Sequence, residues 1–173
     1  EELDSKKRWG FKEVTIQLPY RSDLPTLEET KAQLLHWQHE ETKALSSGDQ
    51  ASARDFRALV EQMTRQITRL SSLPGTKTYE YTFQLLIWGD SLWVFLPGEL
   101  YQMFQINLRN RFPSHAVIIA TLSNEWQPGY LPEASSYGYG IYQEKIATVA
   151  PGCLEVLLET VTRELKLMIS KFN

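Results

Sequence analysis

The stretch that decides the fold reads Leu92-Trp93-Val94-Phe95-Leu96-Pro97-Gly98-Glu99. Its first five residues are all apolar, which is typical of a strand that is buried on both faces. Pro97 and Gly98 break this strand. Glu99 then opens a helix predicted over residues 100–111, where an acid in the first turn complements the helix dipole. The stretch therefore predicts a strand, a tight turn and a helix.

A second apolar strand follows over residues 116–122. A short helix between two such strands favours parallel pairing through a right-handed crossover. Glu99 and Asn124 each follow the carboxyl end of one of these strands. Both residues are therefore expected at the same edge of the sheet, which is where open α/β sheets bind ligands.

The rest of the chain supplies the other elements of an α/β fold. Alternation of apolar residues predicts strands over residues 13–18 and 79–87. Apolar periodicity predicts helices over residues 27–45 and 50–70, joined as a hairpin, and a final helix from about 153 to 171. The predicted fold is a mixed sheet with parallel central strands, a helical hairpin near the N-terminus and a C-terminal helix.

Two domain descriptions fit this order of elements. Residues 1–173 form either a single α/β domain or the C-terminal portion of a larger catalytic domain. Within it, residues 26–72 form the helical hairpin, and residues 78–173 form the sheet with loops that resemble a metal site. Residues 1–12 are expected to be a charged lead-in, with Trp9 and Phe11 as anchors.

Composition narrows the function classes. Of the 173 residues, 42% are apolar and 23% charged, which excludes disorder. The 18 basic and 21 acidic residues give a net charge of −3 without a basic block, which argues against nucleic acid as a partner. No apolar run approaches the roughly 20 residues of a spanning helix, so no transmembrane segment is expected. The chain opens without Met, which suggests a processed product or an excised piece.

A long loop over residues 123–143 is rich in Gly, Pro and Tyr. Long loops at the carboxyl edge of a sheet are often functional. Its aromatic side chains suit the wall of an apolar substrate cleft, or alternatively pack on one another in a structural loop. The candidate substrate-binding residues in and beside this loop are Asn124, Trp126, Tyr137, Tyr139 and Tyr142.

Several short motifs carry a resemblance to a known family. They are Pro97-Gly98-Glu99, Asn124, Gly129-Tyr130-Leu131-Pro132, Tyr139-Gly140-Ile141-Tyr142 and Ala150-Pro151-Gly152. In order and spacing they resemble the C-terminal part of the neutral/alkaline non-lysosomal ceramidase family, and most closely its remote bacterial relatives. The resemblance covers about residues 78–170.

This resemblance implies a zinc amidohydrolase that cleaves an amide of an N-acylated lipid or a similar substrate. The family holds zinc with two histidines, a glutamate and a tyrosine, and the last two match Glu99 and Tyr130. Such oxygen ligands suit catalytic zinc, which keeps one position open. Leu100-Tyr101 and Leu131-Pro132 stand where ceramidases have threonines, so a substrate other than ceramide is expected.

The three histidines of the chain do not match the two that the family uses. His36 and His39 are interpreted as part of a solvated helix face, and His115 as an exposed loop residue at the far end of its strand. The resemblance therefore places the missing ligands in an N-terminal portion of the same protein, and the chain alone is expected to be inactive. A soluble full-length protein, secreted or periplasmic, is compatible with the resemblance.

Two other interpretations stay open. The chain is alternatively a non-catalytic α/β binding or interaction module that retains the fold. It is otherwise a stable fragment that stays associated with the rest of a longer protein, in which case exposed apolar surface would favour self-association.

Overall fold

Alternating apolar side chains form two long strands that pair along their whole length. The computed structural model describes residues 9–171, in which β1 (Trp9–Pro19) pairs antiparallel with β2 (Thr78–Trp88). Every second residue of β2 from Tyr79 to Ile87 is buried, which confirms the predicted alternation. The lead-in predicted over residues 1–12 is wrong from Trp9 onward, because Trp9 and Phe11 continue the alternation of β1. The remainder of that prediction lies outside the described residues.

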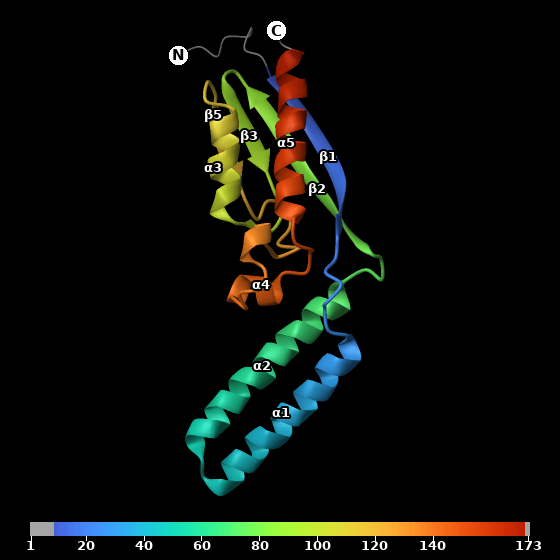
Figure 1. Cartoon of the computed structure of the whole chain (residues 1–173), viewed down its shortest axis with the longest axis vertical. Coiled ribbons are helices and arrows are strands. Elements are labelled where there is room, and N and C mark those ends of the chain that lie inside the picture. The colour runs from blue at the N-terminus through green and yellow to red at the C-terminus, as the bar shows by residue number, and fades with distance from the viewer. Residues whose placement is uncertain (1–8, 172–173) are drawn as a thin grey trace. The chain divides into compact units, whose positions relative to one another are not determined.

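Two further strands complete a mixed sheet in the order β1-β2-β3-β5 (Figure 1). β3 (Ser91–Phe95) pairs antiparallel with β2, and β5 (Ala116–Ala120) pairs parallel with β3. The helix α3 (Gln102–Arg111) connects the two parallel strands. The predicted α/β fold with parallel central strands is thus confirmed. The carboxyl ends of β3 and β5 lie together, since Phe95 is in register with Ala120.

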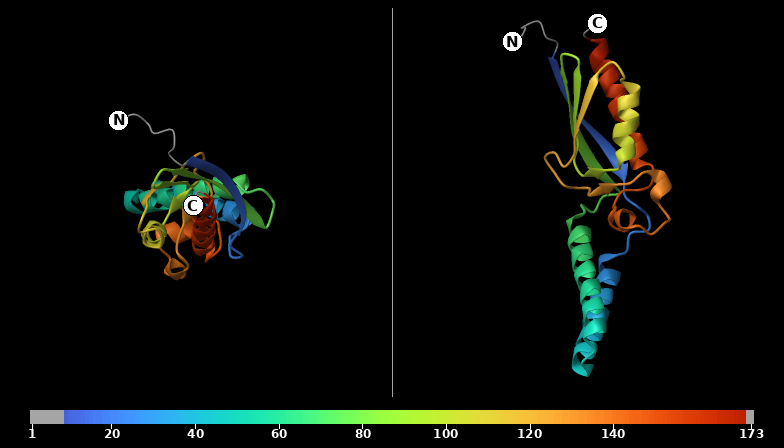
Figure 2. Two further views of the ribbon diagram at one scale, coloured as in Figure 1. Left: turned by 90° about the horizontal axis from the view of Figure 1, so that it is seen from above. Right: turned by 90° about the vertical axis from the view of Figure 1, so that its left-hand side faces the viewer.

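Two helices cover only one face of this sheet. α3 and the C-terminal helix α5 (Cys153–Ser170) both lie on that side, as the right-hand view of Figure 2 shows. They enclose a core with Leu92, Val94 and the buried face of β2. Trp93 and Phe95, which point to the other face, are only half-buried. The prediction that residues 92–96 are buried on both faces is therefore wrong, because α3 and α5 pack on the same face and leave Trp93 and Phe95 half-exposed.

The predicted helical hairpin is confirmed. It consists of α1 (Leu27–Ser47) and α2 (Gln50–Ser72), within a compact unit of residues 23–76. Thr26 and Glu29 form a capping box at the start of α1, and Asp49 caps α2 through the Ser52 N–H. These charge-stabilising bonds lower the pKa of the Glu29 and Asp49 carboxyls.

The long loop contains more structure than its composition predicts. It includes β6 (Tyr130–Leu131), the short 3-10 helix η1 (Ala134–Ser136) and the beginning of α4 (Tyr142–Ile146). β6 pairs parallel with β4 (Glu99–Leu100) in a second, two-stranded sheet. Glu99 therefore lies in a strand. The prediction that Glu99 is in the first turn of a helix is wrong, because α3 begins only at Gln102.

None of the helices within residues 9–171 combines the length and the apolar character that crossing a membrane requires.

Candidate functional site

The turn after β3 is bound to the loop after β5 by backbone hydrogen bonds. The Gly98 N–H donates to the Glu125 carbonyl at 3.2 Å, and the Glu99 N–H donates to the Gly129 carbonyl at 2.8 Å. These bonds take the backbone donors that a helix beginning at Glu99 would leave unpaired. They place Glu99 directly opposite Tyr130 in the β4–β6 pair.

Gly98 is required for this approach. Its φ angle is +72°, in the left-handed region, and a Cβ atom built on it would stand 2.6 Å from the Gly129 carbonyl oxygen. The Gly129 carbonyl is a backbone group, which cannot swing aside as the end of a flexible side chain can. The two loops can therefore meet at this distance only when residue 98 has no side chain.

Glu99 and Tyr130 form the centre of the candidate site. Burial and the neighbouring Glu99 carboxylate, which accepts a hydrogen bond from the phenol, raise the pKa of Tyr130. The Tyr142 ring packs edge-on against the Tyr130 ring, with 6.2 Å between the ring centroids. The charges of Tyr101 and Tyr142 also contribute to the raised pKa of Tyr130. One exposed carboxylate and three phenols thus gather at this edge of the sheet.

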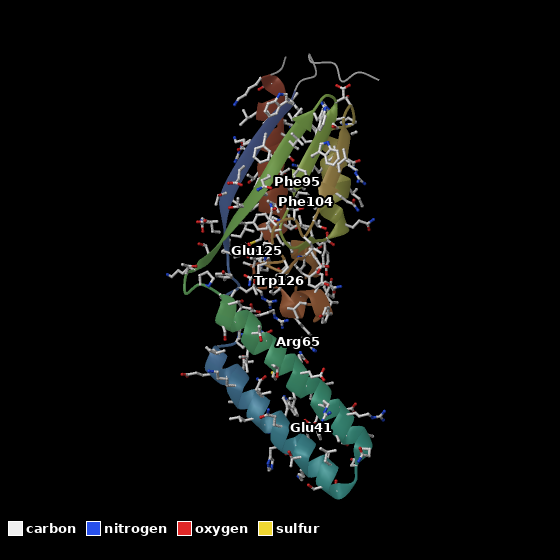
Figure 3. The ribbon with its side chains drawn as sticks, turned by 180° about the vertical axis from the view of Figure 1, so that it is seen from behind. Glu41, Arg65, Phe95, Phe104, Glu125 and Trp126 are labelled. Atoms are coloured by element: carbon white, nitrogen blue, oxygen red, sulfur yellow. The ribbon has the colours of Figure 1, made fainter. Side chains whose placement is uncertain are left out.

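Asn124 and Trp126 lie in the loop that holds the turn. The Asn124 amide donates to the side-chain oxygen of Gln84 on β2 at 2.8 Å, and the residue has a φ angle of +68°. The Trp126 side chain is 57% exposed. Figure 3 shows Trp126 and its neighbour Glu125 at the end of the sheet away from the turn between β2 and β3. Both predicted residues follow β5 at the expected edge.

The three predicted tyrosines have different surroundings. Tyr142 contacts Tyr130, and Tyr139 is 79% exposed. Tyr137 donates through its hydroxyl to the Val149 carbonyl, and its ring lies under the guanidinium of Arg21. Burial raises the pKa of Tyr137. Tyr137 therefore has bonds that stabilise the fold, while Tyr142 is the one that the fold brings to Tyr130.

Glu144 fixes the glycine-rich part of the loop. Its carboxylate accepts the N–H groups of Gly138 at 2.9 Å and Gly140 at 2.7 Å. These two bonds lower the pKa of the Glu144 carboxyl, with the Gly138 bond contributing most. The loop is consequently held in one conformation from η1 to α4, which fixes the backbone on both sides of Tyr139.

A pocket of about 220 Å³ adjoins the site. It lies between the start of α3 and the end of β5, and its lining includes Leu100, Tyr101, Gln105 and Ile119. Typical small-molecule sites measure about 300–1,000 Å³. Its lining also includes Gln102 and Thr121, so by itself this pocket would hold only a small group with polar atoms.

The site offers two oxygen donors for a metal. Within residues 9–171, no three His, Cys, Asp or Glu side chains gather in a way that could hold a metal ion. His115 precedes β5 and packs edge-on against Phe112, at the other end of the strand from Asn124. His36 and His39 lie on α1, in the helical hairpin. Glu99 and Tyr130 supply a carboxylate and a phenol oxygen side by side, and a carboxylate oxygen is one of the ligand types that zinc accepts.

Comparisons with models of known protein families, with curated proteins and with solved structures found no match to this chain.

Two residues with interactions at this edge of the sheet, Tyr101 and Glu125, were not predicted from the sequence. Tyr101 acts on Tyr130, and Glu125 accepts a hydrogen bond from the Tyr79 hydroxyl at 3.3 Å. Tyr101 is two residues after Glu99, so recognition of a strand at 99–100 would have placed it near that carboxylate. No sequence signal pairs Glu125 with Tyr79, since 46 positions separate them.

We expect Gly98→Ala to lower the free energy of unfolding by about 2–5 kcal/mol, from the left-handed backbone and the clash together. Gly138→Ala is the matched control: it has a φ of +95° and open space around its Cβ position, so it should cost only about 1–2 kcal/mol. Urea denaturation of both variants measures the difference. Equal losses of unfolding free energy in the two variants would show that the close approach to Gly129 does not contribute to the cost of a side chain at position 98.

We expect Glu99→Gln to lower the pKa of Tyr130, because the substitution removes the negative charge that opposes ionisation of the phenol. A titration of tyrosine Cζ chemical shifts by NMR, with Tyr130→Phe for assignment, measures this pKa. Glu133→Gln serves as the control and should leave the value unchanged. A pKa that stays the same in Glu99→Gln would contradict the proximity of the two side chains.

Proposed function

We propose that this chain is the C-terminal portion of a ceramidase-like zinc amidohydrolase, in which Glu99 and Tyr130 are two of the zinc ligands. The observation that carries the proposal is the register of β4 and β6, which sets Glu99 against Tyr130 at the carboxyl edge of the parallel strands. The sequence motifs assigned these two residues to one metal site. Their contact in the fold supports that assignment.

The chemistry of the pair suits a cation. An exposed carboxylate provides an anionic oxygen, and the adjacent phenol provides a second oxygen once its proton leaves. A tyrosine phenol is protonated at neutral pH. Burial and the Glu99 carboxylate raise the pKa of Tyr130 further, which opposes loss of the proton in the absence of a cation. A divalent ion between the two groups would reverse this preference, because it offsets the charge of the carboxylate.

Zinc would supply a Lewis acid for an amide carbonyl and a water molecule with a lowered pKa. The residues of this chain would hold the ion and shape its surroundings. Tyr142 packs on the ring of Tyr130 and limits its movement, while Asn124 and Trp126 border the same sheet edge. The substrate class is an amide of an N-acylated lipid or a similar compound, for which aromatic side chains provide apolar contact.

The proposal assigns the two histidine ligands to an N-terminal portion of the same protein. Two oxygen ligands hold zinc poorly, so we expect the purified chain to hydrolyse no N-acyl substrate on its own. The zinc content of the longer protein, measured by elemental analysis, is the test. Glu99→Gln and Tyr130→Phe should each lower it, along with amidase activity, whereas Glu133→Gln should not.

Two results would contradict the proposal. One is amide hydrolysis by the isolated chain at enzyme-like rates. The other is a longer protein whose zinc content and activity do not depend on Glu99 or Tyr130.

A second candidate is a non-catalytic interaction module. The observation that favours it is the sheet face opposite α3 and α5, where Trp93 and Phe95 remain half-exposed. In a module of this kind, Glu99→Gln would leave ligand binding unchanged.

A further inference from the structure

Four neutral polar side chains line the pocket of about 220 Å³ between the start of α3 and the end of β5 (Figure 1). They belong to Tyr101, Gln102, Gln105 and Thr121. Gln102 and Thr121 are exposed, while Tyr101 and Gln105 are half-buried. None of these four side chains has a hydrogen-bond partner within residues 9–171. Their donors and acceptors are therefore available to a ligand in the pocket.

A second pocket, along α5, differs in this respect. It measures about 440 Å³ and also has polar residues in its lining. The hydroxyls of Thr162 and Ser170 donate to backbone carbonyls of the same helix, and Glu159 is paired with Arg111. An acid and two hydroxyls of this pocket are thus already engaged within the protein. Of the two pockets, the one between α3 and β5 is the better candidate for a binding site.

The lining of the pocket between α3 and β5 indicates the chemical class of its ligand. None of the seven residues in this lining is charged, so a charged ligand would lose hydration without gaining a counter-charge. Two hydroxyls and two side-chain amides each supply both a donor and an acceptor. The hydroxyl groups of a ligand also donate and accept, so they match this lining. Leu100, Phe104 and Ile119 add apolar surface for the C–H groups of such a ligand.

The volume of the pocket limits the size of the ligand. At about 30 Å³ for each molecule of liquid water, the pocket corresponds to about seven water molecules. This volume is below the 300–1,000 Å³ or so of sites for drug-sized ligands. One small ring that carries hydroxyl groups suits this space. A longer molecule would place only its terminal group in the pocket.

We propose that this pocket binds one neutral polyhydroxylated ring of the size of a hexose, either as a free sugar or as the terminal sugar of a larger molecule. Tyr101, Gln105 and Thr121 hydrogen-bond to its hydroxyl groups, and the apolar part of the lining contacts its C–H groups. The proposal does not depend on a metal at Glu99 and Tyr130, because neither residue belongs to the lining.

NMR titrations of the isotope-labelled chain with D-glucose, D-galactose and D-mannose test the proposal. These hexoses carry the same hydroxyl groups in different orientations. At the binding energy typical of each non-hydrogen atom, a hexose with about 12 such atoms should have a dissociation constant of about 1–10 mM. We expect at least one hexose to give saturable shifts at the side-chain amides of Gln102 and Gln105 and at the Thr121 methyl group. Sodium acetate and 1-butanol, as a charged and an apolar control, should give none at the same concentrations.

Two variants test the hydrogen bonds. Gln105→Leu and Thr121→Val each remove polar groups and keep the size of the side chain. Each should weaken hexose binding about 3–10-fold, as the loss of one hydrogen bond does. Asn110→Leu is the matched control and should leave the dissociation constant unchanged, because Asn110 is exposed near the end of the same helix and outside the lining. Circular dichroism melts establish that every variant folds.

Methyl glycosides of the same hexoses distinguish the two sources of the ligand. Binding that survives the methyl group indicates a sugar linked to a larger molecule, and binding that the methyl group abolishes indicates a free sugar.

Two results would overturn the proposal. One is the lack of saturable shifts at the pocket with every hexose, at concentrations well above the millimolar range. The other is binding that neither Gln105→Leu nor Thr121→Val weakens, or that acetate or 1-butanol reproduces. A failure of the zinc site at Glu99 and Tyr130 would leave all of these results unchanged.

Discussion

The approach of the Gly98 backbone to the Gly129 carbonyl is the constraint on which the candidate site depends. It lets the turn after β3 and the loop after β5 exchange backbone hydrogen bonds, and these bonds form the β4–β6 pair. The parallel pairing of β3 and β5 brings the two segments to one edge. The glycine contact then sets the register that places Glu99 opposite Tyr130. A side chain at position 98 would move the two oxygen donors apart without touching either of them.

Much of the fold could be predicted from the sequence, because its elements carry strong local signals. The alternation in β2 and the capping residues Thr26 and Asp49 led to correct elements within a few residues. The parallel pairing followed from a helix between two apolar strands. The exposure of the sheet face opposite α3 and α5 could not be predicted in the same way. Trp93 and Phe95 are as apolar as their buried neighbours, and a sequence does not show whether a second layer covers them.

The role of Glu99 and Tyr130 as metal ligands stays a prediction, and the geometry around them was predicted only in part. The motifs pointed to Glu99 and Tyr130, and the fold brings them together. A helix was expected to begin at Glu99, because a two-residue strand has no periodicity to read and depends on a distant partner. Tyr137 was expected in a substrate wall, yet its hydroxyl is bound to Val149. Hydrogen bonds between distant segments decide such roles, and spacing along the chain does not encode them.

The proposed metal chemistry rests on the contact between Glu99 and Tyr130 at one end of the sheet. A zinc titration of the chain, followed by NMR at the carboxyl carbons of Glu and the Cζ carbons of Tyr, tests this metal site most directly. We expect the signals of Glu99 and Tyr130 to shift together, even when the affinity is weak. Shifts confined to the imidazole signals of His36 and His39, with Glu99 and Tyr130 unchanged, would contradict it.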